Sequence, residues 1–442
     1  MARFLFSIAS FVLLALPARA DVTLFENVRV FDGVSPELTA PMNVLVRDNV
    51  IARITPEPIP TDADAAITLI DGGGGTLMPG LIDAHTHLVM GAISLVELMT
   101  SDQNYVMLRA GAAAGDFLMR GFTTARDMGG PTFGLKQAID AGYLAGPRIY
   151  PSGATISQTA GHGDFRMTLE LPRADGEIHY AERYGYTAIA DGVDEVLRRT
   201  RENLMRGASQ IKLMAGGGVA SQFDPLDVTQ YTASEMRAAV EAAASWNTYV
   251  TVHAYTPGAV RQAIEAGVKA IEHGQLADEA TVKMMADNGV WWSLQPFLDD
   301  EDANPYPEGS PNRVKQRLMT AGTDRAYALA KKHGVKLAWG TDALFAPGLA
   351  ARQNRQLTKM TRWFTPAEVL KMATHDNAEL LALSGPRNPY PGRLGVVEEG
   401  ALADLLLVNG DVLADIALLN DPAANLLVIM KDGEIFKNLA GR

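Results

Sequence analysis

Cysteine is absent from this sequence of 442 residues. Its absence excludes disulfides, a cysteine nucleophile, zinc–thiolate clusters and cysteine-ligated iron–sulfur sites. Positive charge is scarce as well, because 39 Lys and Arg residues face 51 Asp and Glu residues and leave a net charge of −12. Binding to nucleic-acid phosphates favours the opposite balance, so no nucleic-acid partner is expected.

An apolar run near the N-terminus, at residues 4–16, is too short for a membrane span, which needs about 20 apolar residues. Arg3 precedes this run, and Pro-Ala-Arg-Ala at residues 17–20 ends it with an Ala-x-Ala pattern. This order predicts a signal peptide over residues 1–20 that is cleaved after Ala20. We therefore expect a periplasmic or secreted protein with no membrane association after cleavage.

Both ends of the remaining chain have β character. Residues 21–79 contain short, partly alternating apolar runs that are separated by turn residues such as Asp48 and Asn49. Residues 386–442 contain similar runs and a hairpin signal at residues 431–434. These patterns predict a small β-sandwich domain formed by both chain ends, on either side of a larger domain at residues 80–385.

The middle of the chain alternates between short apolar segments and helical patterns, such as those at residues 234–244 and 257–266. Eight candidate strands lie at residues 80–88, 121–129, 147–153, 211–217, 249–254, 270–274, 291–296 and 336–342. Such repetition is typical of a parallel, TIM-like (β/α)8 barrel of the α/β class rather than of an open sheet. The functional residues of such a barrel lie at the C-terminal ends of its strands.

Four of the eight histidines fall at predicted strand ends. His85 and His87 are two residues apart on the first strand, so their side chains share one face. His253 and His273 end the fifth and sixth strands, and Asp342 ends the eighth. Each of these residues alone has an ordinary structural explanation, such as a helix cap for the aspartate. Their convergence at one barrel mouth predicts a metal site.

Lys212 lies in the fourth predicted strand, among apolar side chains. A buried ammonium group is costly unless it is paired, neutralised or modified. Alone, this lysine could extend its amine to solvent. At the same strand ends as the histidines and the aspartate, it is a sixth group able to bind metal.

The motif Pro-Gly-Leu-Ile-Asp-Ala-His-Thr-His at residues 79–87, the lysine of strand four and the segment at residues 400–405 resemble the amidohydrolase superfamily. The resemblance extends over essentially the whole mature chain and is to the binuclear-metal subtype. It implies a carbamate on Lys212, formed with CO2, that bridges two divalent metal ions, usually zinc. By the same resemblance, one ion is held by His85, His87 and Asp342, and the other by His253 and His273.

The chemistry implied by this resemblance is amide hydrolysis. Two neighbouring metal ions acidify a bridging water to hydroxide and polarise the scissile carbonyl. Asp342 would accept a proton from the hydroxide and pass it to the leaving amine. Carbamylation would also turn the buried cation at Lys212 into an anionic oxygen ligand.

Two further motifs, at residues 122–130 and 156–164, resemble exported Xaa-Pro dipeptidases, carboxypeptidase-like members and ochratoxin-hydrolysing amidohydrolases. They imply a small-molecule or peptide substrate: a dipeptide or an N-acyl amino acid with a free carboxylate on the amine side. His162 and Tyr231 are, by resemblance, the candidates for contacting that carboxylate or the carbonyl oxygen. Arg126 is expected to form a structural ion pair. The acidic, proline-containing loop at residues 299–311 could overhang the mouth as a lid, but a solvated loop is the simpler explanation.

Other functions remain open at this point. A mononuclear deaminase or an imidazolone-type cyclic amide hydrolase would keep the histidines and the aspartate but would not need Lys212. A lactone or organophosphate hydrolase would use the same binuclear site. A non-catalytic binding protein on a decayed barrel would be expected to have lost ligands, whereas all six positions are intact. The native metal, the preferred side chains and the oligomeric state, monomer or homo-oligomer, are not determined by the sequence.

Overall fold

The computed structural model describes residues 22–60, 67–173, 176–303 and 305–440. The predicted signal peptide, residues 1–20, lies outside these ranges. Within the described residues, no helix combines the length and the apolar character that a membrane crossing requires.

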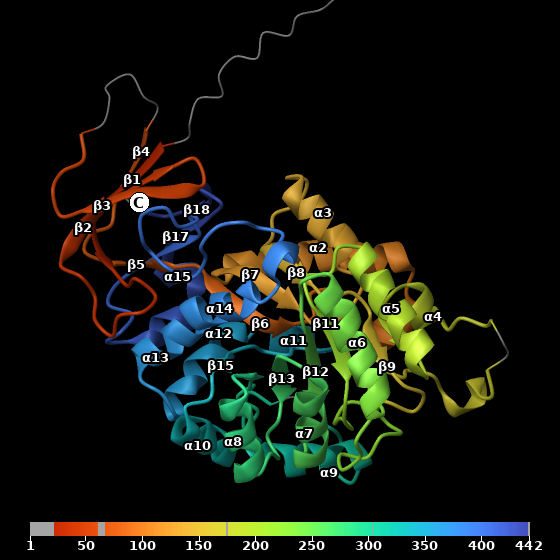
Figure 1. Cartoon of the computed structure of the whole chain (residues 1–442). Helices are drawn as coiled ribbons and strands as arrows, with labels where there is room; N and C mark the ends of the chain where they lie inside the picture. Colours follow the sequence, from red (N-terminus) through yellow and green to blue (C-terminus); the bar gives the residue numbers. More distant parts are fainter. Residues whose placement is uncertain (1–21, 61–66, 174–175, 304, 441–442) are drawn as a thin grey trace, which may run out of the picture.

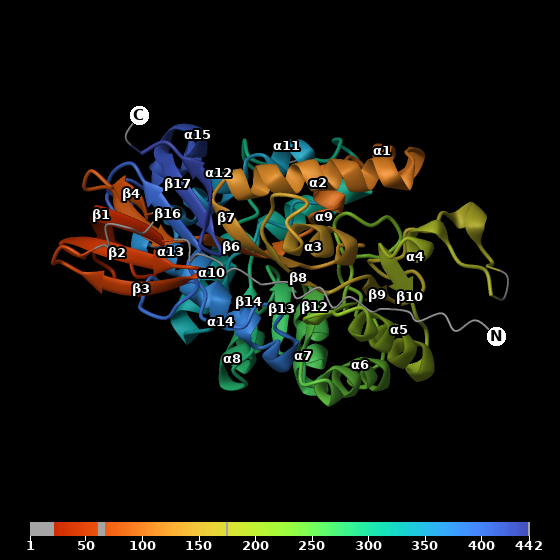
Figure 2. The same cartoon turned by 90° about the horizontal axis from the view of Figure 1, so that it is seen from above.

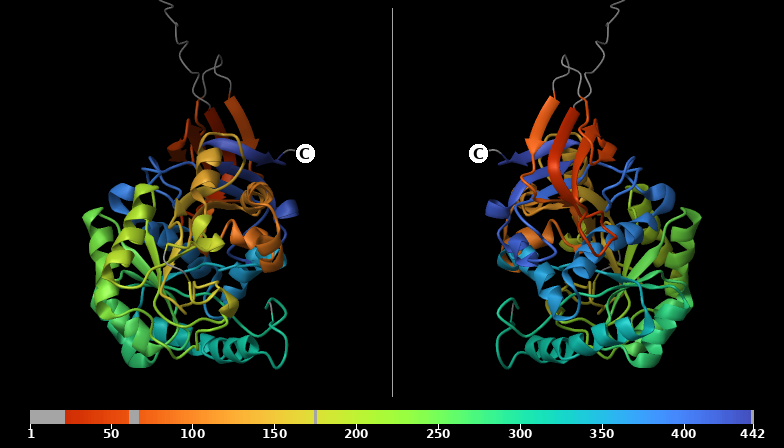
Figure 3. Two further views of the ribbon diagram at one scale, coloured as in Figure 1. Left: turned by 90° about the vertical axis from the view of Figure 1, so that its right-hand side faces the viewer. Right: turned by 90° about the vertical axis from the view of Figure 1, so that its left-hand side faces the viewer.

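Strands from both ends of the chain form one domain at one end of the molecule (Figures 1 and 3). They are β1 (Val22–Val30), β2 (Pro41–Arg47), β3 (Val50–Thr55), β4 (Ile67–Asp71), β5 (Thr76–Pro79), β16 (Leu405–Val408), β17 (Leu426–Lys431) and β18 (Glu434–Asn438). They form one mixed sheet of order β18-β17-β16-β5-β1-β2-β3, with β4 paired to β1. The two ends of the chain meet where β5 and β16 pair antiparallel. The expected β-rich domain formed by both chain ends is therefore confirmed.

This sheet closes around an apolar core of its own. The turn between β2 and β3 reaches the segment before β16, because the Asn49 carbonyl accepts a hydrogen bond from the Ala403 N–H (2.8 Å). The Ala403 carbonyl in turn accepts one from the Gly433 N–H in the β17–β18 hairpin (3.0 Å). Buried side chains of both chain ends, such as Val44 and Leu405, fill the space between.

The middle of the chain forms the expected parallel barrel, with helices on its outside (Figures 1 and 2). Its strands are β6 (Leu81–Thr86), β7 (Phe122–Asp127), β8 (Arg148–Pro151), β9 (Thr155–Ser157), β11 (Ile211–Met214), β12 (Val250–Ala254), β13 (Ala270–His273), β14 (Trp291–Ser293) and β15 (Leu337–Ala338). Two strands, β8 and β9, share the third strand position of the barrel, because β8 pairs with β7 whereas β9 pairs with β11. A hydrogen bond from the Ala84 N–H to the Trp339 carbonyl (3.1 Å) links the eighth position to the first.

The strand pattern differs from expectation at this third position. The segment predicted at residues 147–153 covers β8 alone, and neither β9 nor β10 (Thr187–Ile189), which pairs with β9, was expected. Gly153 lies between β8 and β9 at a φ of 74°, which interrupts the extended backbone. Strands of three residues are also too short to show alternation.

Helices cover the barrel. The longer ones are α2 (Gln103–Met119), α3 (Phe133–Asp140), α5 (Val193–Met205), α6 (Ala233–Ser245), α7 (Pro257–Ala266), α8 (Glu279–Asp287), α9 (Pro311–Thr320) and α10 (Thr323–His333). Shorter ones are α1 (Leu95–Thr100), α4 (Tyr180–Arg183), α11 (Pro347–Ala350), α12 (Gln353–Thr358), α13 (Pro366–Lys371), α14 (Asn377–Ala382) and α15 (Pro422–Asn425). Two of these helices, α6 and α7, lie at the helical stretches expected at residues 234–244 and 257–266. Side-chain hydrogen bonds cap the N-termini of several helices, as at α6, where Thr232 and Glu235 form a capping box. Apolar side chains between strands and helices, including Trp292 and Trp339, form the main core.

Candidate active site

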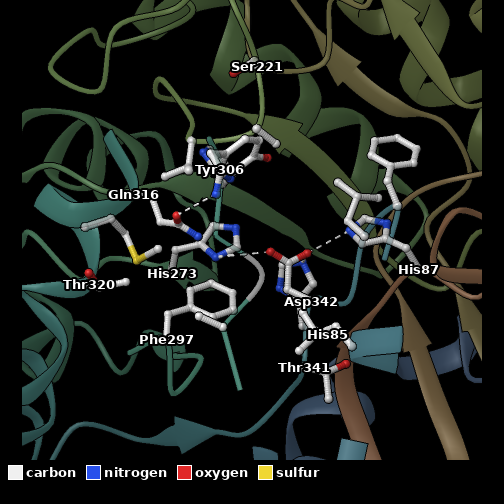
Figure 4. A pocket seen from close by; sticks show the side chains of 18 of the residues that line it. His85, His87, Ser221, His273, Phe297, Tyr306, Gln316, Thr320, Thr341 and Asp342 are labelled. Carbon is white, nitrogen blue, oxygen red and sulfur yellow. Dashed lines mark hydrogen bonds and ion pairs between the residues drawn. The ribbon is translucent and has the colours of Figure 1, made fainter. Parts of the chain in front are cut away.

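Histidine and carboxylate side chains converge at the C-terminal ends of the barrel strands (Figure 4). The Asp342 Oδ1 atom lies 3.2 Å from the Nε2 atoms of both His85 and His87. Its Oδ2 atom lies 3.9 Å from the Nδ1 atom of His273. The ligand atoms of His85, His87 and Asp342 all lie within 4.8 Å of one another, which suits a shared metal ion.

The other candidate ligands border the same space. The rings of His253 and His273 are 4.5 Å apart between centroids, and those of His85 and His273 are 5.0 Å apart. Lys212 is buried on β11, one strand away from His253 on β12. All six predicted metal ligands therefore line one cavity.

The backbone at two of these positions adopts a conformation that side-chain-bearing residues rarely take. His273 has a φ of 75° and Asp342 a φ of 49°. Non-glycine residues in this left-handed region are uncommon and cluster at functional sites, where surrounding structure holds them. His273 at the end of β13 and Asp342 in the segment after β15 both line the cavity.

Each histidine of the cluster has one ring nitrogen already bonded within the protein. The contacts are His85 Nδ1 to Glu272 (2.7 Å), His87 Nδ1 to the Gly129 carbonyl (3.0 Å), His253 Nε2 to the Gly217 carbonyl (3.1 Å) and His273 Nδ1 to the Gln295 side-chain oxygen (2.8 Å). Because these oxygens are acceptors, the histidines donate to them, and a neutral ring keeps its lone pair on the other nitrogen. This is how metal-binding histidines are oriented in proteins, so the donor set fits divalent metal ions.

Glu272 supports the cluster from beneath and was not singled out from the sequence. It is fully buried, accepts the hydrogen bond from His85 and forms an ion pair with Arg126 at 2.6 Å. Burial would raise the pKa of Glu272, but Arg126 and His85 outweigh burial and hold that pKa well below its ordinary value. Arg126 thus has the kind of structural ion pair that was expected. The sequence did contain a signal for Glu272, because a charged residue stands directly before His273 in an otherwise apolar strand.

Lys212, unlike Arg126 and Glu272, has no close partner for its buried charge among the residues that the structure describes. Burial lowers the pKa of its ammonium group to about 8, although Glu272 and Asp342 act in the opposite direction. No residue in the described part of the chain forms a hydrogen bond or a close ion pair with its amine. The barrel mouth therefore holds a buried amine that is unusually easy to deprotonate.

The two predicted substrate contacts have different locations. His162 lines the cavity, and its ring stacks on that of His253 at 4.0 Å. Tyr231 does not line it: the side chain is buried in the main core, and its backbone N–H donates to Gln158. The structure thus brings His162 to the candidate ligands and leaves the role of Tyr231 a prediction.

The cavity above the cluster has a volume of about 420 Å3 and mostly apolar walls. One group of lining residues is Met90, Leu95, Phe165, Leu344 and Phe345, and another is Val219, Tyr255, Phe297, Tyr306 and Met319. Residues of the β14–α9 segment, among them Asp302 and Pro305, line the mouth. Part of the predicted loop at residues 299–311 therefore borders the site, and its action as a lid stays a prediction.

Comparison with known proteins agrees with this geometry. The sequence profile of the amidohydrolase family matches residues 76–436. Ochratoxinase from Aspergillus niger is 35% identical over 375 residues, which cover 82% of this chain and 75% of that protein. A crystal structure of a prolidase complexed with N-methylphosphonate-L-proline is 33% identical, with a TM-score of 0.83 over 94% of this chain and 100% of that one.

A third similar protein is a Xaa-Pro dipeptidase whose crystal structure has methionine bound in the active site. It is 28% identical, with a TM-score of 0.80 over 95% of this chain and 100% of that one. The family is generally metal-dependent, in keeping with the His-His-Asp group described above. The chain therefore belongs to the amidohydrolase family and is a hydrolase that acts on amide bonds.

Proposed function

We propose that this protein hydrolyses dipeptides or N-acyl amino acids that carry a free carboxylate on the amine side of the scissile bond. The observation that carries the proposal is the convergence of Lys212, four histidines and Asp342 on the floor of a cavity with apolar walls. The similarity to an ochratoxinase, a prolidase and a Xaa-Pro dipeptidase supports the same substrate class.

The proposed cofactor is a pair of divalent metal ions, with zinc as the expected metal. His85, His87 and Asp342 would hold one ion, His253 and His273 the other, and a carbamate on Lys212 both. When bound, such a pair acidifies a water molecule and polarises the scissile carbonyl.

The environment of Lys212 suits carbamate formation. The reaction joins the neutral amine nitrogen to the carbon of CO2 and releases one proton, so it needs the deprotonated lysine. A pKa of about 8 provides that form near neutral pH. The product is an anion, which removes the uncompensated buried cation and supplies oxygen ligands.

Asp342 is the proposed proton carrier. Burial would raise its pKa, but His85 and His87 outweigh burial and keep the carboxyl group ionised. An ionised carboxylate on the cavity floor can accept a proton during attack on the carbonyl and return it to the leaving amine.

The cavity wall offers groups for the rest of the substrate. Apolar side chains would receive the side chains on either side of the amide. The Nδ1 atom of His162 is engaged by Ser221 at 2.7 Å, so its Nε2 atom is the ring nitrogen left to meet a carboxylate or carbonyl oxygen.

A paired substrate series tests the proposal. Metal-replete protein is assayed with N-benzoyl-L-phenylalanine and L-alanyl-L-phenylalanine, and with the analogues in which a primary amide replaces the carboxylate. We expect release of phenylalanine from the acids and a kcat/KM about 10- to 100-fold lower for the analogues, because hydrogen bonds to charged groups are lost. Absence of turnover in both series would overturn the proposal.

Two alternatives use related chemistry. The position of Lys212 among the ligands favours a binuclear site over a mononuclear deaminase or an imidazolone-type hydrolase. Lactone or organophosphate hydrolysis remains the second candidate, since it would use the same six metal ligands. Hydrolysis of a lactone series with the amide series untouched would favour it.

We also propose export of the mature protein. The N-terminal pattern that ends at Ala20 supports a periplasmic or secreted location. The intact mass of protein recovered from the exported fraction should correspond to a chain that begins at Asp21. A chain that retains residues 1–20 in the cytoplasmic fraction would contradict export.

A further inference from the structure

Lys315 on α9 joins that helix to a loop that is distant in sequence. Its ammonium group donates hydrogen bonds to the carbonyls of Gly218 (3.0 Å), Ser221 (2.9 Å) and Asp224 (2.8 Å). All three acceptors belong to the 216–226 loop, which follows β11. The three donors of one lysine are thus spent on three backbone groups of one loop.

Asn312 reinforces this connection one turn earlier on α9. Its side-chain amide donates to the carbonyl of Val219 (2.7 Å) and to that of Ser221 (3.2 Å). Two side chains on the same face of α9 therefore determine where the 216–226 loop lies.

The 216–226 loop packs directly against His162. A Cβ atom placed on Gly218 would come within 1.9 Å of the His162 ring, and one on Gly217 within 1.7 Å of the Pro225 carbonyl oxygen. Only glycine leaves room for this approach of backbone to ring. Any movement of the loop at these positions would therefore move the imidazole.

A hydrogen bond to the 216–226 loop also holds the ring of His162 in place. The Nδ1 atom lies 2.7 Å from the Ser221 hydroxyl, and the ring stacks on His253 at 4.0 Å. Ser221 also provides the carbonyl that Lys315 and Asn312 both bind. Figure 4 shows Ser221 on its loop at the edge of the cavity.

We propose that Lys315 is a positioning residue for His162. It acts through the 216–226 loop, without touching substrate, and sets the direction in which the imidazole faces the substrate. The inference rests on the proposed function, in which His162 meets a carboxylate or carbonyl oxygen. It adds that α9, through its contacts with the 216–226 loop, determines how well His162 contacts the substrate.

The test is a double-mutant cycle between Lys315 and His162. Lys315→Met keeps the length of the side chain and removes its three donors. We expect it to lower kcat/KM for N-benzoyl-L-phenylalanine by about 10-fold, the effect of losing charge-assisted hydrogen bonds. Metal content should stay at the wild-type level. Because Lys315 acts only through His162, the variant H162A/K315M should be as active as H162A, within about twofold.

Matched variants separate positioning from general damage. Lys332→Met removes an exposed lysine on α10 and should leave kcat/KM unchanged. Asn312→Ala removes the second anchor and should repeat the effect of Lys315→Met more weakly. It also provides the same cycle with His162 if Lys315→Met does not fold. Additive losses in the cycle would overturn the inference.

A spectroscopic measurement is independent of turnover. The chain has eight histidines, so the ring signals of His162 can be identified by their loss in H162A in a histidine-selective 1H–15N spectrum. Lys315→Met should shift or broaden those signals, whereas Lys332→Met should not. Unmoved His162 signals would overturn the inference. Displaced signals in a protein without amide turnover would keep the positioning role and reject the proposed function instead.

Discussion

At the scale of single residues, the balance of buried charge explains the barrel mouth. Arg126 and Glu272 neutralise each other at 2.6 Å, with both side chains fully buried. Lys212 and Asp342 then remain as a cation and an anion that face the cavity. Loss of either member of a buried ion pair leaves an uncompensated charge, so Arg126 and Glu272 have a structural role. Lys212 has no such partner in the described part of the chain, and its amine is available for carbamate formation.

Replacement of Lys212 by alanine should disrupt the metal site. Metal content of purified protein is measured by elemental analysis with bicarbonate present. Wild type should hold about two ions per chain, the number a two-metal hydrolase needs, and Lys212→Ala should hold far less because the bridging ligand is gone. The matched control is Lys283→Ala, an exposed lysine on α8. One ion per chain in both wild type and Lys212→Ala would favour the mononuclear deaminase.

At the scale of elements, the β-domain and the barrel are joined without a linker. Strand β5 ends at Pro79 and β6 begins at Leu81, with Gly80 donating its N–H to the Asp404 carbonyl (2.8 Å). Arg148 on β8 reaches across to Asp404, with contacts of 2.9 and 3.0 Å, and to Asp432 at 2.7 Å. These contacts hold the base of β6, the strand that carries His85 and leads to His87.

Loss of Arg148 should destabilise the whole fold. Arg148→Met leaves the buried Asp404 carboxylate uncompensated, so we expect the free energy of unfolding to fall by about 3–5 kcal/mol. Burial raises the pKa of Asp432, but Arg148 outweighs it and lowers that pKa. The contribution of Asp432 is therefore present above its ordinary pKa and is lost as the pH falls through the lowered value.

Urea denaturation at neutral and acidic pH checks both statements. Arg148→Met should lose stability at neutral pH and show a smaller further loss than wild type on acidification. Arg198→Met, which removes an exposed pair on α5, serves as the control. A cost for Arg148→Met no larger than that of the control would contradict the role of this contact.

The segment over the cavity is held by charges on a neighbouring element. Lys359, the first residue of the 3-10 helix at Lys359–Arg362, contacts Asp300 at 2.8 Å and Asp302 at 3.8 Å. Arg355 on α12 contacts Asp302 at 3.1 Å. These ion pairs connect the segment at the mouth of the cavity to α12 and to the 3-10 helix that follows it.

Lys359→Met should loosen this segment. We expect faster hydrogen exchange of backbone amides at residues 298–303, because the pairs with Asp300 and Asp302 are lost. Exchange rates elsewhere should be unchanged. Lys283→Met is the control, since its partner Asp287 lies on the same helix. Equal exchange at residues 298–303 in wild type and Lys359→Met would show that the ion pairs do not hold the segment.

At the scale of the whole molecule, metal and fold should be coupled. The candidate ligands come from five strands that are distant in sequence, so the complete site exists only in the folded chain. Ions that bind only the folded state stabilise it by mass action, by about 4 kcal/mol when the free metal is 1,000 times its Kd. The barrel closes through few backbone contacts between β15 and β6, where the ligands of both strands meet.

Removal of metal should therefore lower the thermal stability of the protein. Calorimetry before and after chelation should show a fall in Tm that is reversed when zinc and bicarbonate are restored. The His85→Ala variant should show a smaller response, since one ligand is missing. A Tm that does not respond to chelation would mean that no metal ion is coupled to folding.

The barrel, the β-domain of both chain ends and the shared location of six side chains could be predicted from the sequence, because apolar runs mark the strands and the C-terminal ends of parallel barrel strands meet at one mouth. The remaining features depend on contacts between distant segments. Residues 147–153 and β9 share one barrel position through pairing with different neighbours. His162 and Tyr231 both lie in loops, where no period sets the direction of a side chain. Contacts from distant elements, such as that of Lys315 with the 216–226 loop, bring one to the cavity and leave the other in the core.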